Sequence, residues 1–331
     1  MTDERKYAAI MADPLWGSQR MRRFRARARL AMPPRPTVGI LTAMPVEFTA
    51  MREMIDGAQR CDASGDPARY ITGTMPSRDP REPHRVVLTQ LGDTGNDAAA
   101  DACANLCRSF ESVGHVLMVG VAAGVPNLKR PERHVRVGDI VVSTWGVVDY
   151  DHVVDTAAGR RSRQPFPRPS RLFVHAARWL EAGELRAEHP WERWIDLVAA
   201  RNPAFARPAA CTDVLYLADS APASIPHPDP DQSGHIAGRP KVHYGNVGSG
   251  DRALRSICSR DALAQEHDLI AFDMEGKGFA NASFAHDLGW LVIRGVSDYG
   301  DSRTDGTWRG YASLSAAAYA RALIAECAPL A

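Results

Sequence analysis

From Thr37 onward, short runs of aliphatic and β-branched residues alternate with longer alanine-rich segments, and this alternation constrains the fold more than any other feature of the chain. The strand-length runs are 38–43, 85–91, 115–121 and 139–148, and the helical segments are 46–55 and 96–110. A continuous apolar run of strand length is typical of a strand buried on both faces. The order therefore predicts an α/β domain with a mixed, largely buried central sheet.

Two segments interrupt this pattern. Residues 32–36 (MPPRP) suit neither a helix nor a central strand, so residues 1–36 are predicted to form an N-terminal helical arm and linker before a domain at 37–331. Between about 156 and 240, prolines and charged residues gather around two helical islands, at 171–185 and 191–201, which indicates an insertion. The last part, residues 220–240, is rich in proline and is predicted to be a mobile loop.

The α/β pattern resumes after the insertion. Its predicted strands are 243–250, 270–274 and 290–296, and its predicted helices begin near 252 and span 276–288 and 313–327. A chain of 331 residues is long for one domain but short for two. A single α/β domain with a large insertion is therefore expected.

Composition and charge exclude several classes of protein. An apolar fraction of 45% with 24% charged residues is ordinary for a globular protein and excludes a disordered chain. A net charge of +1 provides no general attraction to nucleic acid or membrane, so neither is expected as a partner. The arginine-rich stretch 18–30 is not followed by the apolar run of a signal peptide, which predicts a cytoplasmic protein. This stretch is interpreted as a solvated or subunit-contact helix.

The six cysteines show no metal-ligand spacing. Only Cys103 and Cys107 are near neighbours, in an alanine-rich helical run, and the cysteines are interpreted as buried, reduced thiols. Neither a metal nor a cofactor is expected.

Three carboxylates, those of Glu47, Glu275 and Asp298, stand at the ends of predicted strands, where open α/β sheets bind their ligands. Each has a structural explanation as well. Glu47 and Glu275 lie at the start of predicted helices, where the helix dipole favours a carboxylate in any protein. Asp298 could cap a loop. Position alone therefore leaves their roles open.

The sequence around these carboxylates resembles the nucleoside phosphorylase and nucleosidase superfamily, and within it the methylthioadenosine and adenosylhomocysteine nucleosidases. The matching segments occur in the same order: 39–47 (GILTAMPVE), 137–143 (VGDIVVS), 249–251 (SGD), 273–275 (DME) and 294–298 (RGVSD). The resemblance implies a three-layer α/β/α fold of the phosphorylase/hydrolase type and a homo-oligomer. It implies an N-ribosidase that releases a purine from ribose.

Three further segments resemble bacterial effector-type nucleosidases associated with phage defence. They are 134–139 (HVRVGD), 294–301 (RGVSDYGD) and 308–311 (WRGY). Some members of that branch hydrolyse ATP to adenine and ribose triphosphate, so the resemblance implies a possible defence role.

Cleavage of an N-ribosidic bond builds positive charge on the sugar and negative charge on the base. An acid must protonate the base, while a carboxylate and a nucleophile act at the sugar. The resemblance assigns these roles. Asp298 is the general acid at N7, and Glu47 orients and deprotonates water. Glu275 and Met274 bind ribose, and Ser297 and Arg294 hold or tune Asp298.

Two departures from the family pattern bear on the reaction. Residues 120–124 (GVAAG) lack the hydroxyl with which phosphorylases bind phosphate in this turn, so water is favoured as the nucleophile and phosphorolysis stays the alternative. No aromatic residue follows the SGD turn. Phe272 is the candidate for stacking on the base, whose identity stays open.

The segment containing Arg160, Arg161 and Arg163 could bind substrate phosphates, because guanidinium groups form paired hydrogen bonds to them; a solvated loop is the alternative. We therefore hypothesise that a purine nucleotide such as ATP is preferred over adenosine or methylthioadenosine. A catalytically inactive nucleotide sensor is a further alternative. The presence of both an acid and a base argues against it, because binding alone requires neither.

Overall fold

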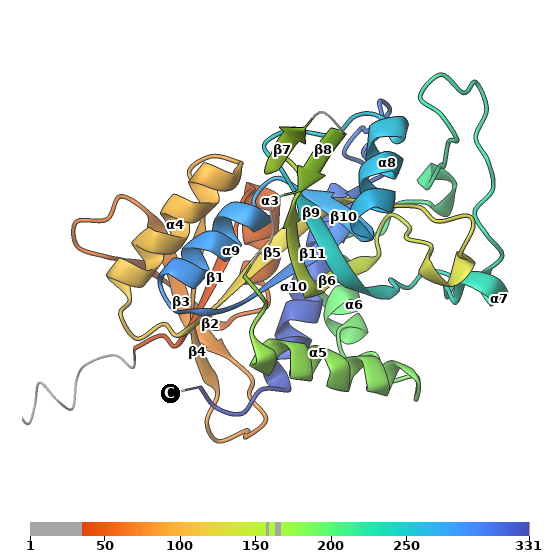
Figure 1. The fold of residues 1–331 in the computed structure, drawn as a ribbon. Coiled ribbons are helices and arrows are strands. Elements are labelled where there is room, and N and C mark those ends of the chain that lie inside the picture. The colour runs from red at the N-terminus through yellow and green to blue at the C-terminus, as the bar shows by residue number, and fades with distance from the viewer. Residues whose placement is uncertain (1–34, 157–158, 163–166, 331) are drawn as a thin grey trace, which may run out of the picture. The chain divides into compact units, whose positions relative to one another are not determined.

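A nine-stranded mixed sheet runs through the domain shown in Figure 1, a computed structural model that describes residues 35–156, 159–162 and 167–330. The strand order is β10-β9-β6-β11-β5-β1-β4-β3-β2. The strands are β1 (Val38–Thr42), β2 (Asp56–Asp62), β3 (Arg69–Met75), β4 (His84–Gln90), β5 (His115–Gly124), β6 (Ile140–Asp149), β9 (Val242–Ser249), β10 (Leu269–Asp273) and β11 (Gly289–Asp298).

Parallel and antiparallel pairs are mixed in this sheet, as predicted. Strands β4, β1, β5 and β11 are parallel neighbours, whereas β11 pairs antiparallel with β6. Strand β10 pairs with β9 and also, through two residues, with β5. The strands β5, β11, β6, β9 and β10 therefore close into a ring, and the ends of β10 and β11 come near each other although the two strands are not paired.

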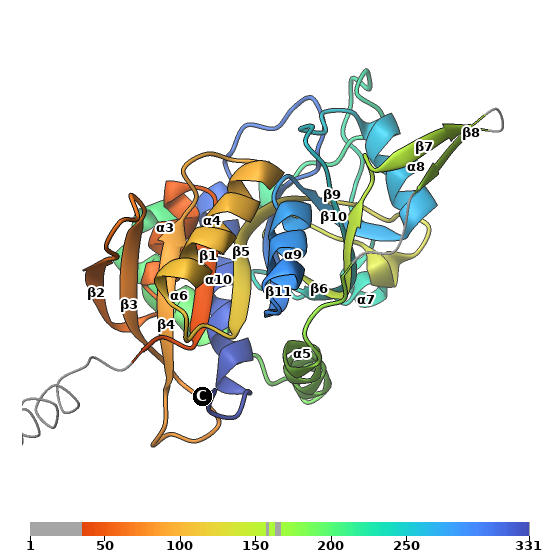
Figure 2. The same ribbon diagram turned by 60° about the vertical axis from the view of Figure 1, so that its left-hand side comes forward.

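Helices cover both faces of the sheet, which confirms the three-layer α/β/α prediction. Figure 2 shows α4 (Asn96–Ser109) and α9 (Gly276–Ala285) together on one face, where they pack on Leu41 and its neighbours. On the other face, α3 (Pro45–Arg52) and α10 (Arg309–Ala325) pack on Ile40 and its neighbours. Consecutive strand residues thus serve opposite cores, because side chains alternate along a strand.

Helices α4 and α9 approach each other closely at one glycine. A Cβ atom at Gly278 would lie 1.8 Å from the carbonyl oxygen of Asn96, so only glycine permits this contact. This contact fixes the starts of α4 and α9, and both helices begin beside the pocket described below.

The insertion contains both predicted helices, α5 (Arg171–Glu184) and α6 (Glu192–Arg201), and a short helix α7 (Pro230–Ser233). It also contains an antiparallel hairpin of β7 (Val153–Thr156) and β8 (Gly159–Ser162). In the backbone register of this hairpin, Arg160 lies opposite Asp155 and Arg161 lies opposite Val154. Arg163 and the N-terminal arm lie outside the described residues. The prediction of a mobile loop over 220–240 is wrong for Ser233 and His235, whose side chains are buried.

Other sequence predictions also need correction. Strands β2 and β3 were not predicted, because their polar and charged residues hide the strand pattern. The helix expected from residue 252 is α8 (Ile257–His267), which begins after the N-cap Ser256. Cys211 and Cys258 are exposed, so the expectation of buried thiols is wrong for these two. Within the described residues, no helix is long and apolar enough to cross a membrane.

Candidate active site

A pocket with a volume of about 180 Å³ lies at the carboxyl ends of the central strands. Six of the residues selected from the sequence line it: Glu47, Phe272, Met274, Glu275, Ser297 and Asp298. A larger hollow of about 490 Å³, beside α8, is lined by none of them. The smaller of these two pockets is therefore the candidate site, because it joins Glu47, Glu275 and Asp298 to an apolar wall.

Glu47 lies in the first turn of α3 and is almost fully buried. Its Oε2 accepts hydrogen bonds from the amides of Ala43 and Met44, each at 2.8 Å, and its Oε1 accepts one from the amide of Val121 at 2.8 Å. Burial raises the pKa of Glu47, although Arg294 and these amides oppose the shift. Because Oε1 accepts one hydrogen bond from the described part of the chain, it retains capacity for a water molecule.

Arg294 is fully buried on β11. Its Nε and Nη2 lie 2.9 and 2.7 Å from Oδ2 of Asp273, and Nη2 lies 3.4 Å from Oε2 of Glu275. The prediction that Arg294 holds Asp298 directly is therefore wrong, whereas an effect of its charge on Asp298 stays a prediction. The two residues are four positions apart on one strand, about 13 Å in an extended chain, whereas the ring of strands brings Asp273 alongside.

The remaining nitrogen of Arg294, Nη1, is buried and has no hydrogen-bond partner within the described residues. A Cβ atom at Gly120 would lie 2.5 Å from this nitrogen and 2.6 Å from Oε1 of Glu47. No nitrogen of Arg294 forms an ion pair with Glu47 within 4.0 Å in the described chain. An unpaired donor and an available acceptor thus flank Gly120 at a separation that one water molecule could bridge.

Glu275 is the N-cap residue of α9, two positions after the end of β10, and its Oε1 accepts a hydrogen bond of 3.2 Å from the amide of Gly95. Burial, opposed by Arg294 and reinforced by the charges of Asp273 and Glu47, raises the pKa of Glu275 to about 7. Close to neutral pH this carboxylate can therefore exchange its proton, as suits an acceptor for hydroxyl groups in a buried site.

Asp298 ends β11 at the same pocket. Its Oδ2 accepts a hydrogen bond of 2.8 Å from the hydroxyl of Ser297, and the predicted role of Ser297 in holding or tuning Asp298 stays a prediction. Its Oδ1 accepts bonds of 2.9 Å from the amide of Gly300 and 3.3 Å from the hydroxyl of Thr304. The residues that follow the strand thus fix the carboxyl group.

Among the other residues that line the pocket are an aromatic residue and three arginines that were not expected there. Tyr150 contacts Phe272 edge to face, with ring centroids 5.6 Å apart, and the other three are Arg252, Arg255 and Arg309. Arg252 forms a 2.8 Å ion pair with Asp151. Arg309 belongs to the segment 308–311 and Arg252 directly follows the segment 249–251, so their positions were visible in the sequence but their orientation was not.

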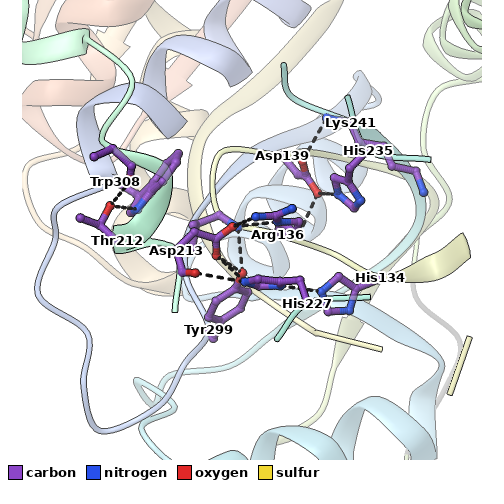
Figure 3. A network of polar contacts seen from close by, with 12 residues as sticks. His134, Arg136, Asp139, Thr212, Asp213, His227, His235, Lys241, Tyr299 and Trp308 are labelled. Atoms are coloured by element: carbon purple, nitrogen blue, oxygen red, sulfur yellow. Dashed lines mark hydrogen bonds and ion pairs between the residues drawn. The ribbon is translucent and has the colours of Figure 1, made fainter. Parts of the chain in front are cut away.

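A second cluster, of Asp139, His235 and His243, is buried outside the pocket (Figure 3). Both Nε2 atoms lie 2.8 and 2.9 Å from Oδ2 of Asp139. Amides of Arg136 and Lys241 donate to the same carboxylate at 2.8 and 3.0 Å. Ligand atoms around tetrahedral zinc lie about 3.3 Å apart, so these distances fit hydrogen bonds rather than a metal centre. Burial opposes ionisation, yet the two histidine bonds hold the pKa of Asp139 well below its usual range.

Comparison with known families decides the relationship that these features suggest. The sequence pattern described as the phosphorylase superfamily matches residues 37–326. The chain belongs to the phosphorylase superfamily.

Curated relatives of this superfamily member include two nucleosidases and a nucleotide-binding leucine-rich repeat-like protein. The chain is 27% identical to a 5′-methylthioadenosine/S-adenosylhomocysteine nucleosidase of Mycobacterium bovis, over 87% of this chain and 95% of that protein. It is 25% identical to the ATP nucleosidase Cap17 of Escherichia coli, over 85% of this chain and 50% of that protein. A nucleotide-binding leucine-rich repeat-like protein of Hyaloscypha variabilis is 28% identical over 88% of this chain, which spans only 29% of that relative.

Solved structures show the same fold. The 5′-methylthioadenosine/S-adenosylhomocysteine nucleosidase of Neisseria meningitidis, in complex with methylthio-immucillin-A, matches with a TM-score of 0.56 at 20% identity, over 87% of this chain and 98% of that one. The futalosine hydrolase of Helicobacter pylori matches with a TM-score of 0.55 at 16% identity, over 87% of this chain and 97% of that one.

Proposed function

We propose that this protein is an N-ribosidase that hydrolyses the N-glycosidic bond of a purine nucleoside or nucleotide. The observation that carries the proposal is the single pocket lined by Glu47, Glu275 and Asp298. The names of the mycobacterial and Neisseria nucleosidases support the same reaction class.

In the proposed mechanism, Asp298 donates a proton to N7 of the departing purine, so that the base leaves as a neutral molecule. Glu275 accepts hydrogen bonds from the ribose hydroxyls, and Met274 packs on the sugar. Water between Glu47 and Arg294 Nη1 loses a proton to Glu47 as its oxygen bonds to C1′. The raised pKa of Glu47 suits it to this role, because a base with a higher pKa holds the proton more firmly.

Hydrolysis is favoured over phosphorolysis by the wall around Gly120. Val121, Ala122 and Ala123 line the pocket there without a hydroxyl or a cation, and Arg294 is already paired with two carboxylates. Free phosphate would therefore meet negative charge at the position of the nucleophile. A purine nucleoside phosphorylase remains the alternative to be tested.

We propose that the substrate is a 5′-phosphorylated purine nucleotide such as ATP. We also propose that the protein acts in antiviral defence. Support comes from Cap17, an ATP nucleosidase, and from the three arginines that line the pocket, Arg252, Arg255 and Arg309. The segment of Arg160, Arg161 and Arg163 remains a proposed source of phosphate ligands. Methylthioadenosine is the second candidate, because the mycobacterial relative is matched over almost its full length.

The test is base release from ATP, AMP, adenosine and methylthioadenosine, with and without phosphate, followed by chromatography. We expect a free base without phosphate and no ribose 1-phosphate. An Asp298→Asn preparation controls for contaminating nucleosidases. If the protein binds nucleotides but releases no base, it is a nucleotide sensor, and if it forms ribose 1-phosphate, it is a phosphorylase.

Two sets of variants test the phosphate ligands. We expect alanine at Arg160, Arg161 and Arg163, or at Arg252 and Arg309, to lower kcat/KM for ATP by about 10²-fold and to change the value for adenosine far less, because charge-assisted hydrogen bonds are strong. Alanine at Arg186, an exposed insertion residue paired with Glu188, is the matched control. If the variants of one set keep the wild-type preference for ATP, the arginines of that set belong to the solvated surface and do not bind substrate phosphates.

We also propose that the protein forms a homo-oligomer, as the family resemblance implies. Light scattering on the purified full chain tests this proposal, and a monomeric mass across the working concentration range would reject it.

A further inference from the structure

The segment that follows Asp298 determines how the carboxyl group of Asp298 is held. We call residues 299–308, between β11 and α10, the acid loop. Its Gly300 amide and Thr304 hydroxyl donate hydrogen bonds of 2.9 and 3.3 Å to Oδ1 of Asp298. A shift of this loop would therefore turn or displace the group proposed as the general acid.

The insertion holds the acid loop at three places, and Figure 3 shows two of them, at Tyr299 and Trp308. The buried Tyr299 donates a hydrogen bond of 2.6 Å from its hydroxyl to Oδ1 of Asp213. Trp308 donates from its indole nitrogen to the hydroxyl of Thr212 at 3.1 Å. Arg303 donates to the carbonyl oxygen of Ala221 at 2.7 Å.

The middle of this contact is rigid because Asp213 is held from several sides. Arg136 donates from Nε and Nη2 to Oδ2 of Asp213 at 2.8 and 2.7 Å, and Nε2 of His227 lies 3.1 Å from Oδ1. Burial opposes ionisation, but the bonds from His227 and Tyr299, together with the charge of Arg136, lower the pKa of Asp213. The carboxylate is therefore ionised at neutral pH and accepts from four donor groups.

A pair of histidines sets the direction of the hydrogen bond to Asp213. The amide of Asn127 donates to Nδ1 of His134 at 3.1 Å, so a neutral His134 carries its proton on Nε2. That nitrogen lies 3.0 Å from Nδ1 of His227, which leaves the His227 proton on Nε2, facing Asp213. Burial and the neighbouring His227 lower the pKa of His134 to about 4, so this arrangement holds at neutral pH.

We propose that Asp213, a residue of the insertion that does not line the pocket, is a positioning residue for the general acid, acting through Tyr299 and the acid loop on Asp298. This inference rests on the proposed hydrolase function. It gives the insertion a role in the chemical step that is separate from the binding of substrate phosphates. Asp213 touches neither the substrate pocket nor the reacting atoms.

The test compares Asp213→Ala, Asp213→Asn and Tyr299→Phe in the full chain, with the nucleoside or nucleotide that wild type cleaves fastest. We expect kcat to fall by about 10- to 100-fold in Asp213→Ala, since small misplacements of catalytic groups have effects of this size. KM should stay within about twofold, because the pocket wall is unchanged. Asp213→Asn, which retains an oxygen to accept from Tyr299, should recover part of the rate.

Tyr244→Phe is the matched control. Its hydroxyl donates a 2.7 Å hydrogen bond to Oε1 of Glu184, which also joins a core strand to the insertion but not to the acid loop. We expect it to lower the melting temperature about as much as Tyr299→Phe does and to keep kcat. The double variant Asp213→Ala with Tyr299→Phe should have about the same kcat as Asp213→Ala, because both changes remove the hydrogen bond between Tyr299 and Asp213 that carries the proposed effect.

Hydrogen exchange of residues 299–308 tests whether Asp213 holds the acid loop and needs no assay of activity. The inference can therefore fail independently of the proposed function. We expect these amides to exchange at least about tenfold faster in Asp213→Ala and unchanged in Tyr244→Phe. The inference is overturned by wild-type kcat in Asp213→Ala, by a loss of kcat in Tyr244→Phe of the same size, or by unchanged exchange in the loop. Should Asp213→Ala fail to fold, the same measurements on Tyr299→Phe decide.

Discussion

Gly120→Ala places a methyl group between Oε1 of Glu47 and Nη1 of Arg294, where it would crowd the proposed attacking water. The new Cβ would lie 2.5 Å from Nη1 of Arg294 and 2.6 Å from Oε1 of Glu47, whereas ordinary contacts begin at 3.4 Å. Oε1 would have to retreat by roughly 0.8 Å, and a misplacement of about 1 Å can reduce a rate by 10²-fold. Three hydrogen bonds from backbone amides hold the Glu47 carboxylate and oppose this retreat. We therefore expect kcat to fall by roughly 10²-fold.

The assay is single-turnover base release with the preferred substrate, together with urea unfolding. Insertion of a methyl group into a packed site costs about 1–3 kcal/mol, so the variant should remain folded while losing activity. Gly92→Ala is the control, because a Cβ atom there meets nothing within 4 Å. If Gly120→Ala retains the wild-type rate, the nucleophile does not occupy the space between Glu47 and Arg294.

Three further predictions concern the carboxylates. Asp298→Asn should abolish base release and preserve nucleoside binding measured by calorimetry, because an amide cannot donate the required proton; a wild-type rate would reject Asp298 as the acid. Glu47→Gln should lower kcat by about 10²- to 10⁴-fold with little change in melting temperature, and added phosphate should not restore the rate. Because the pKa of Glu275 is raised to about 7 in the folded protein, its stabilising effect is complete below its ordinary value of 4.5 and is lost as pH rises through 7. Urea unfolding from pH 5 to 8 should therefore show wild type losing stability relative to Glu275→Gln, by a few kcal/mol at most; parallel curves would contradict the shift.

The sequence predicted the residues that line the site better than it predicted their partners. Glu47 and Glu275 follow a strand by a few residues and Asp298 ends one, each within a contiguous matching segment, so the resemblance located all three carboxylates. Arg294 was assigned to the wrong carboxylate, because its contact with Asp273 depends on the closure of β5, β11, β6, β9 and β10 into a ring. No local pattern encodes that closure.

The same distinction explains why Asp213 was missed. It follows a short 3-10 helix (Ala210–Thr212), and nothing in its neighbourhood resembles a catalytic segment. Its significance comes from the hydroxyl of Tyr299, which lies 86 positions away in the chain. Contacts at such separation become visible only when the insertion has been placed against the loop.

The insertion is longer than the connection between β6 and β9 requires. Strands β6 and β9 are parallel neighbours, and such a connection needs only a dozen or so residues. The connection here is far longer, and its surplus packs on the loop after β11, an element that comes later in the chain. His235, from the same insertion, bonds to the buried Asp139 at the start of β6. A segment anchored at both the central strands and the acid loop cannot be exchanged as a simple specificity module, because its removal would release the loop that holds Asp298 and leave the charge of Asp139 without one of its donors.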